Sequence, residues 1–69
     1  MNRTPVTSTS LSEVGYDQSS QTLEITFREG HVYQYFNVPQ PIYEGLMQAV
    51  SVGKFFNAEI RGRYPEARL

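Results

Sequence analysis

The residues that could perform chemistry in this chain are few and lack partners. His31, the single histidine, could act as a general base, but no nucleophile stands at a fixed spacing from it. Glu24, Glu29 and Glu44 could in principle supply a carboxylate pair. Their expected positions on a strand, in a turn and on a helix surface favour solvated side chains instead. No catalytic constellation can be assembled, so the sequence predicts that this chain is not an enzyme.

Metal and phosphate-loop chemistry is also disfavoured. The chain has no cysteine, so a structural zinc ion would have to rest mainly on carboxylates. Gly53 and Lys54 match part of a phosphate-binding loop, but that motif needs glycine where Gln48 stands and serine or threonine where Phe55 stands. We therefore expect no metal, no cofactor and no phosphate loop.

A short basic stripe is the feature that best suggests a ligand. Lys54 and Arg61 are seven residues apart, which places them on one face of a helix with Asn57 between them. Arg63 can extend this stripe, and such side chains contact nucleic-acid phosphates. The candidate nucleic-acid-binding residues are therefore Lys54, Asn57, Arg61 and Arg63. The alternative is an ordinary solvated helix face, since two or three charges often serve only solubility.

The distribution of charge agrees with the position of this stripe. Six basic and seven acidic residues give a formal net charge of −1, which counts against a strongly electrostatic nucleic-acid binder. Residues 1–50 carry two basic and five acidic side chains, whereas residues 51–69 carry four and two. Any anion-binding surface is therefore expected near the C-terminal helix.

Three segments in the first half of the chain have the pattern of β-strands. Residues 22–27 alternate strictly between apolar and polar side chains, which is typical of a half-buried strand. Residues 11–16 hold apolar side chains at a step of three, so this strand is expected to contain a bulge. Residues 31–36 follow Arg28-Glu29-Gly30, in which glycine suits the left-handed position of a tight hairpin.

The length of this hairpin loop decides which side chains the third strand buries. A three-residue loop pairs Leu23 with Tyr35 and Ile25 with Tyr33, and it turns Gln34 toward water. A two-residue loop would bury the amide of Gln34 at a cost of about 1–3 kcal/mol. We therefore expect a structural core that includes Tyr33, Tyr35, Leu23, Ile25, Phe27, Phe55 and Phe56. The open sheet face then carries Val32, Gln34 and Phe36; a base-stacking platform is the alternative role for the two tyrosines.

Two amphipathic helices are predicted after the prolines at 39 and 41. Ile42, Leu46, Ala49 and Val50 have helical spacing, and Ser51 can cap a second helix whose apolar stripe is completed by Val52, Phe55, Phe56 and Ile60. Gly62 is placed to end that helix. The two helices are the only available cover for the apolar sheet face. The sequence thus predicts an α+β fold: a three-stranded antiparallel β-meander followed by two α-helices packed on one sheet face.

One domain is expected, flanked by short tails. Residues 1–9 are rich in serine and threonine and are expected to form a flexible N-terminal tail. Residues 10–65 form the α+β domain, and residues 66–69 form a C-terminal tail. No apolar run approaches the length of a membrane-spanning helix and no signal pattern is visible, so a cytoplasmic location is expected.

Five ordered segments give the chain a family resemblance. They are Val14-Gly15-Tyr16-Asp17, Leu23-Glu24-Ile25-Thr26-Phe27 with Gly30, Tyr33-Gln34-Tyr35, Asn37-Val38-Pro39 and Gly53-Lys54-Phe55-Phe56-Asn57. Together they resemble the KTSC domain, named for the C-terminal domain of some lysyl-tRNA synthetases and also found as stand-alone small bacterial proteins. The resemblance covers residues 9–65, and the family's Tyr-x-Tyr hallmark is matched by Tyr33 and Tyr35. The attachment to a synthetase suggests RNA as a ligand of a family whose function is uncharacterised.

These observations lead to two hypotheses about function. The first is a small non-catalytic binding module that binds RNA, of a tRNA-like kind, weakly through the basic stripe of the second helix. The alternative is a protein–protein interaction module that uses the open sheet face around Val32, Gln34 and Phe36. Shifts of NMR signals on the second helix or on the sheet face would distinguish the two.

Overall fold

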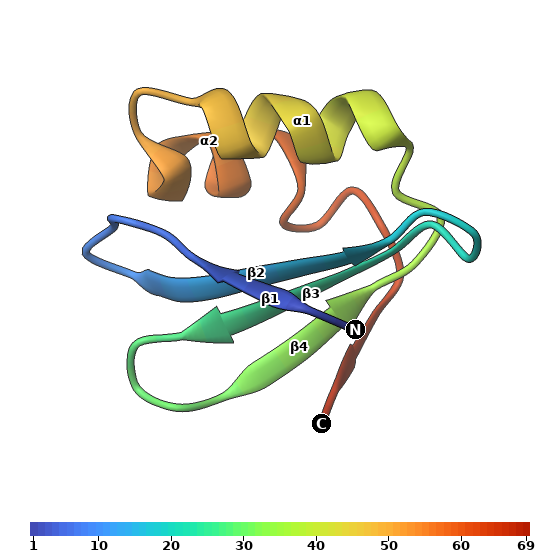
Figure 1. The fold of residues 1–69 in the computed structure, drawn as a ribbon, viewed down its shortest axis with the longest axis horizontal. Coiled ribbons are helices and arrows are strands. Elements are labelled where there is room, and N and C mark those ends of the chain that lie inside the picture. The colour runs from blue at the N-terminus through green and yellow to red at the C-terminus, as the bar shows by residue number, and fades with distance from the viewer.

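The computed structural model describes all 69 residues and shows a two-layer α+β domain. One layer is a five-stranded antiparallel sheet with the strand order β1-β2-β3-β4-β5. Both helices lie in the second layer, over one face of the sheet (Figure 1). In chain order the elements are β1 (Arg3–Pro5), β2 (Leu11–Asp17), β3 (Thr22–Phe27), β4 (Val32–Tyr35), α1 (Gln40–Gln48), α2 (Val52–Glu59) and β5 (Glu66–Arg68).

The central strands β2, β3 and β4 form the expected meander. Leu23 pairs with Tyr35 and Ile25 pairs with Tyr33, so the register predicted from a three-residue hairpin loop is confirmed. The amide of Phe27 donates to the carbonyl of His31 at 2.9 Å, and Gly30 in the loop has φ +103°. The predicted irregularity in β2 is also confirmed, as a register shift between Leu11 and Glu13.

The two ends of the chain differ from the expectation of tails. Residues 3–5 form β1, which pairs with β2, and residues 66–68 form β5, which pairs with β4. All six of these strand residues are exposed. Their order therefore comes from main-chain pairing rather than from apolar burial. Low hydrophobicity does not distinguish such edge strands from tails, because main-chain N–H and C=O groups can pair whatever the side chains are.

The two helices begin and end at identifiable residues. Pro39 stands at the N-cap of α1, and the hydroxyl of Ser51 accepts the amide of Lys54 at 3.3 Å to cap α2. Gly62 adopts a φ of +76° after α2, as its position suggested. One expectation is wrong: Val50 was assigned to the apolar stripe of α1, but that helix ends at Gln48 and Val50 is fully exposed.

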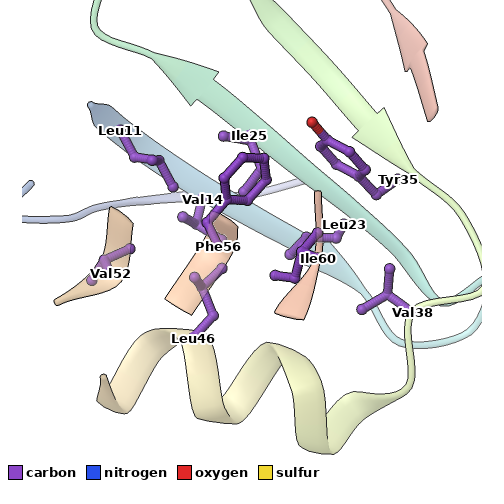
Figure 2. Packing of buried hydrophobic residues seen from close by; sticks show 10 residues of the cluster. All are labelled: Leu11, Val14, Leu23, Ile25, Tyr35, Val38, Leu46, Val52, Phe56 and Ile60. Carbon is purple, nitrogen blue, oxygen red and sulfur yellow. The ribbon is translucent and has the colours of Figure 1, made fainter. Parts of the chain in front are cut away.

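The core lies between the helices and the sheet (Figure 2). Phe56 of α2 is central to it, with edge-to-face contacts to Phe27 and Tyr35 at centroid distances of 5.5 Å. Of the seven residues expected in the core, Leu23, Ile25, Tyr35 and Phe56 are buried, and Tyr33, Phe27 and Phe55 are partly buried against them. The buried set is Leu11, Val14, Leu23, Ile25, Tyr35, Val38, Leu46, Val52, Phe56 and Ile60.

Candidate nucleic-acid interface

A polar cleft runs along α2 where the helix meets the loop before β2 and the β3–β4 turn. It consists of two adjoining hollows of about 400 and 550 Å³. Four residues line both of them: Thr9, Ser10, Gly53 and Asn57. We call this joint hollow the α2 cleft. The first hollow is completed by Leu11, Phe27, Arg28, Glu29, Phe56 and Arg61, and the second by Thr7, Ser8, Val50, Ser51, Val52 and Lys54.

The structure brings three of the four predicted basic-stripe residues to this cleft. Lys54, Asn57 and Arg61 line it from successive turns at the α2 side, and all three are exposed. Arg63 lies outside it; its Nε donates to the carbonyl of Ala58 at 2.9 Å, near the end of α2. The stripe as predicted is therefore divided between the cleft and the helix end.

Arg28 is a cation of the cleft that sequence reasoning missed. It follows β3, lines the cleft beside Phe27, and its Nε donates to the carbonyl of Ser8 at 2.5 Å. The hydroxyl of Ser8 in turn accepts the amides of Ser10 and Leu11 at 3.1 and 3.2 Å. These contacts fix the loop that forms the far wall. No spacing within the sequence signals the contact of Arg28 with Ser8, because it joins residues 20 positions apart.

The charge of the cleft is opposite in sign to that of the whole chain. Arg28, Lys54 and Arg61 face a single acidic residue, Glu29, among the lining residues. The guanidinium of Arg61 lies 5.5 Å from the ring centroid of Phe56, an arrangement in which a cation is attracted to the ring face. Cations gathered in a cleft concentrate the local field. The cleft therefore favours an anionic ligand although the molecule carries a net charge of −1.

A smaller aromatic cavity of about 130 Å³ adjoins one end of the α2 cleft. Phe27, Glu29 and Arg61 line both spaces, and Tyr33, Tyr35 and Glu66 complete the cavity. Burial raises the pKa of Tyr35 to about 12, and the nearby carboxylate of Glu66 adds to this rise. Tyr35 is thus a core residue that also lines the cavity, and in Figure 2 its hydroxyl oxygen is directed away from α1.

The outer sheet face carries a buried polar network that overturns one expectation. Glu24 was expected to be solvated, but it is only 6% exposed, because Arg3 and Gln34 close over it. The Nε of Arg3 lies 2.5 Å from Glu24 Oε2, and Gln34 Nε2 donates to Oε1 at 3.0 Å. Gln34 therefore does not point freely to water. Val32 and Phe36, its neighbours on the open face proposed for protein contact, are half-buried.

The other residues considered for chemistry lie apart from one another. A terminal nitrogen of Arg68 contacts His31 Nδ1 at 2.6 Å across the β4–β5 edge, and Glu44 accepts a hydrogen bond from Gln40 on α1. No three His, Cys, Asp or Glu side chains gather where they could hold a metal ion. Neither helix is long and apolar enough to cross a membrane.

Comparison with known proteins decides the family. The model of the KTSC domain matches residues 7–64. The chain belongs to the KTSC domain family. A solved structure of a KTSC domain protein from Yersinia pestis is 40% identical and superimposes with a TM-score of 0.95, covering 99% of this chain and 96% of that one. The resemblance noted in the sequence is thus confirmed, and the edge strands lie just outside the matched range.

Relatives of this KTSC domain are of two kinds. A protein from Tsukamurella paurometabola is 35% identical and similar over 94% of this chain and 97% of its own length. A lysine–tRNA ligase from Nostoc punctiforme is 43% identical over 86% of this chain, and one from Trichormus variabilis is 37% identical over the same share. The chain spans about a tenth of the length of these ligases. KTSC domains therefore occur both alone and within a larger enzyme.

Proposed function

We propose that this KTSC domain is a non-catalytic module that binds single-stranded RNA weakly along the α2 cleft. The observation that carries the proposal is that Arg28, from the turn after β3, lines the same cleft as Lys54 and Arg61, from α2 and the turn after it. Asn57 and the hydroxyls of Ser8, Thr9 and Ser10 add neutral donors of the kind that contact phosphate oxygens.

The setting of these residues fits a single strand better than a duplex. Half-buried aromatic rings adjoin the cationic cleft at Phe27 and Tyr33, and proteins that bind single strands combine a positive groove with aromatic side chains. The ligase relatives join a segment similar to this chain to a lysine–tRNA ligase. That association supports RNA over other polyanions.

The salt dependence of binding tests the proposal. Three phosphate contacts give a log–log slope of affinity against salt near −2, at about −0.7 per contact on a single strand. A fluorescently labelled uridine hexamer, titrated with the parent chain over a series of salt concentrations that starts low, should show this slope. The triple variant Arg28→Gln, Lys54→Gln, Arg61→Gln should lose most of it while keeping its circular dichroism spectrum.

Two single variants provide matched controls. Arg63→Gln and Arg68→Gln each remove one positive charge, but neither residue lines the cleft. Both should keep the parent slope, whereas Lys54→Gln alone should reduce it by about 0.7. If all single variants lose the same amount of salt slope, the net charge of the chain rather than the cleft causes the binding. If the folded parent binds no RNA at low salt, the proposal fails and protein contact through Val32, Gln34 and Phe36 becomes the leading hypothesis.

A further inference from the structure

The aromatic cavity beside the α2 cleft has the size of a flat ring. Its volume is about 130 Å³, and since an apolar cavity of roughly 150 Å³ in another protein holds benzene, it can receive the six-membered ring of a nucleobase while the rest of the base stays outside. Phe27 and Tyr33, which both line the cavity, meet edge to face with their centroids 5.7 Å apart. Because the cavity shares Phe27, Glu29 and Arg61 with the α2 cleft, a strand lying in the cleft could place one base in it.

The polar groups of the cavity include both donors and acceptors. Glu66 on β5 stands opposite Tyr35 on β4, so the two side chains lie on the same sheet face, and both line the cavity. Arg61 supplies a guanidinium from the turn that follows α2, and Glu29 supplies a second carboxylate from the β3–β4 turn. Both ion pairs of the chain are made by Arg3, so the carboxylates of Glu29 and Glu66 are held by no cation.

We propose that this cavity is a nucleobase subsite that favours guanine, an inference that rests on the RNA-binding function proposed above. A carboxylate accepts two adjacent donors only from the guanine edge that carries N1–H and the exocyclic amino group. Arginine pairs with guanine O6 and N7, and unstacked bases of single-stranded RNA are read by such edge contacts together with aromatic stacking. Uracil and adenine present no pair of adjacent donors to a carboxylate.

Hexamers that differ at one base test the subsite. The parent chain should bind r(UUUGUU) roughly tenfold more tightly than r(UUUAUU) or the uridine hexamer, which corresponds to one bidentate contact. A hexamer with inosine at the same position lacks the exocyclic amino group and should lose most of this preference. Guanosine monophosphate alone should shift the NMR signals of the Tyr33 and Tyr35 rings.

Glu66→Gln separates the subsite from the charge of the cleft. Removing a negative charge should strengthen binding of every hexamer. The ratio of the affinity for r(UUUGUU) to that for r(UUUAUU) should nevertheless fall toward one. Glu59→Gln, on the exposed surface of α2 outside the three hollows, should strengthen binding without changing the preference.

The possible failures are distinguishable. Salt-dependent binding with equal affinity for all four hexamers overturns the base subsite and leaves the phosphate cleft standing. If hexamer binding by the parent chain shows no salt slope, the RNA-binding function is overturned. The base site is retained in that case if guanosine monophosphate still shifts the NMR signals of the two tyrosine rings. An unchanged guanine preference in Glu66→Gln overturns the assigned role of that carboxylate and with it the proposal.

Discussion

Arg3 on β1 reaches Glu24 on β3 by passing over Gly15 of the intervening strand. Arg3 pairs with Gly15 and Gly15 pairs with Glu24, so the three residues form one row on the outer sheet face. The Nε of Arg3 lies 2.5 Å from Glu24 Oε2. A Cβ at Gly15 would lie 3.0 Å from the carbonyl oxygen of Asn2 and 3.1 Å from the sulfur of Met1. The missing side chain of Gly15 therefore allows Met1 and Asn2, which precede β1, to lie this close to β2.

Replacing Gly15 by valine should loosen β1. The added side chain must displace the backbone of Asn2, and such overpacking typically costs about 1–3 kcal/mol. Amide exchange at Val6, which donates to Ser12 at 3.0 Å, should accelerate, and the urea midpoint should fall. Gly53→Ala is the matched control, because a Cβ there meets only ordinary contacts at 3.5 Å and beyond. Unchanged exchange at Val6 in Gly15→Val would contradict this account.

The network of Arg3, Glu24 and Gln34 on the outer sheet face should make the free energy of unfolding depend on pH in the acidic range. Burial alone raises the pKa of Glu24, but hydrogen bonds from Gln34 and Arg3 and the charge of Arg3 outweigh it, so this pKa lies below its ordinary 4.5. The stabilisation that follows is fully present above pH 4.5 and is lost as the pH falls through the lowered value.

Urea unfolding of Arg3→Gln at two pH values measures this contribution. At neutral pH the variant should lose about 1 kcal/mol, since the arginine side chain is partly exposed. At about pH 3 the loss should be smaller, because the carboxylate is then closer to protonation in both proteins. Glu59→Gln should show no such difference. An equal loss of stability at both pH values would show that Arg3 does not act through the charge of Glu24.

Tyr35 should be required for packing and should also limit stability in base. Tyr35→Ala removes a side chain that is 2% exposed and should cost about 3 kcal/mol or more. The raised pKa means that the unfolded chain ionises first, so stability falls as the pH rises from 10 toward about 12.

Tyr35→Phe is the variant that separates packing from ionisation. It keeps the ring and should retain most of the parent's thermal stability at neutral pH. Its decline between pH 10 and 12 should be shallower than that of the parent, though not absent, because the pKa of Tyr16 is also raised by burial. Identical alkaline profiles for the two proteins would show that the hydroxyl of Tyr35 is not held in its neutral form by the fold.

The contribution of the Ser51 cap of α2 to the free energy of unfolding should be measurable separately. Ser51→Ala removes the acceptor for the amide of Lys54 and should lower the free energy of unfolding by about 1 kcal/mol. Ser51→Asp supplies another acceptor at the same position and should restore most of the loss. Thermal melts of the three proteins at neutral pH provide the comparison. If the aspartate variant is as unstable as the alanine variant, the cap is not the cause.

The sequence was most informative where local chemistry determines geometry. The alternation of residues 22–27 and the three-residue loop ending at Gly30 were enough to give the register that buries Tyr35. The edge strands were missed because Arg3–Pro5 is ordered by pairing with a distant strand and not by its own apolar content. Helical spacing located Lys54, Asn57 and Arg61. Arg28 was missed because it reaches the same cleft from the β3–β4 turn, which is distant in sequence. Buried Glu24 was unpredictable for a similar reason: its partners lie 21 and 10 residues away.

The placement of the two termini has a practical meaning for work with this domain. Both ends leave from strands at opposite edges of the sheet layer, whereas α2 lies in the other layer (Figure 1). A linker that continues from either end need not cross the helix. A fluorophore, an affinity tag or a solid support joined through such a linker would hold the domain by its sheet and present α2 outward. The fold thus separates a side for tethering from the helical side, on which the proposed binding surface lies.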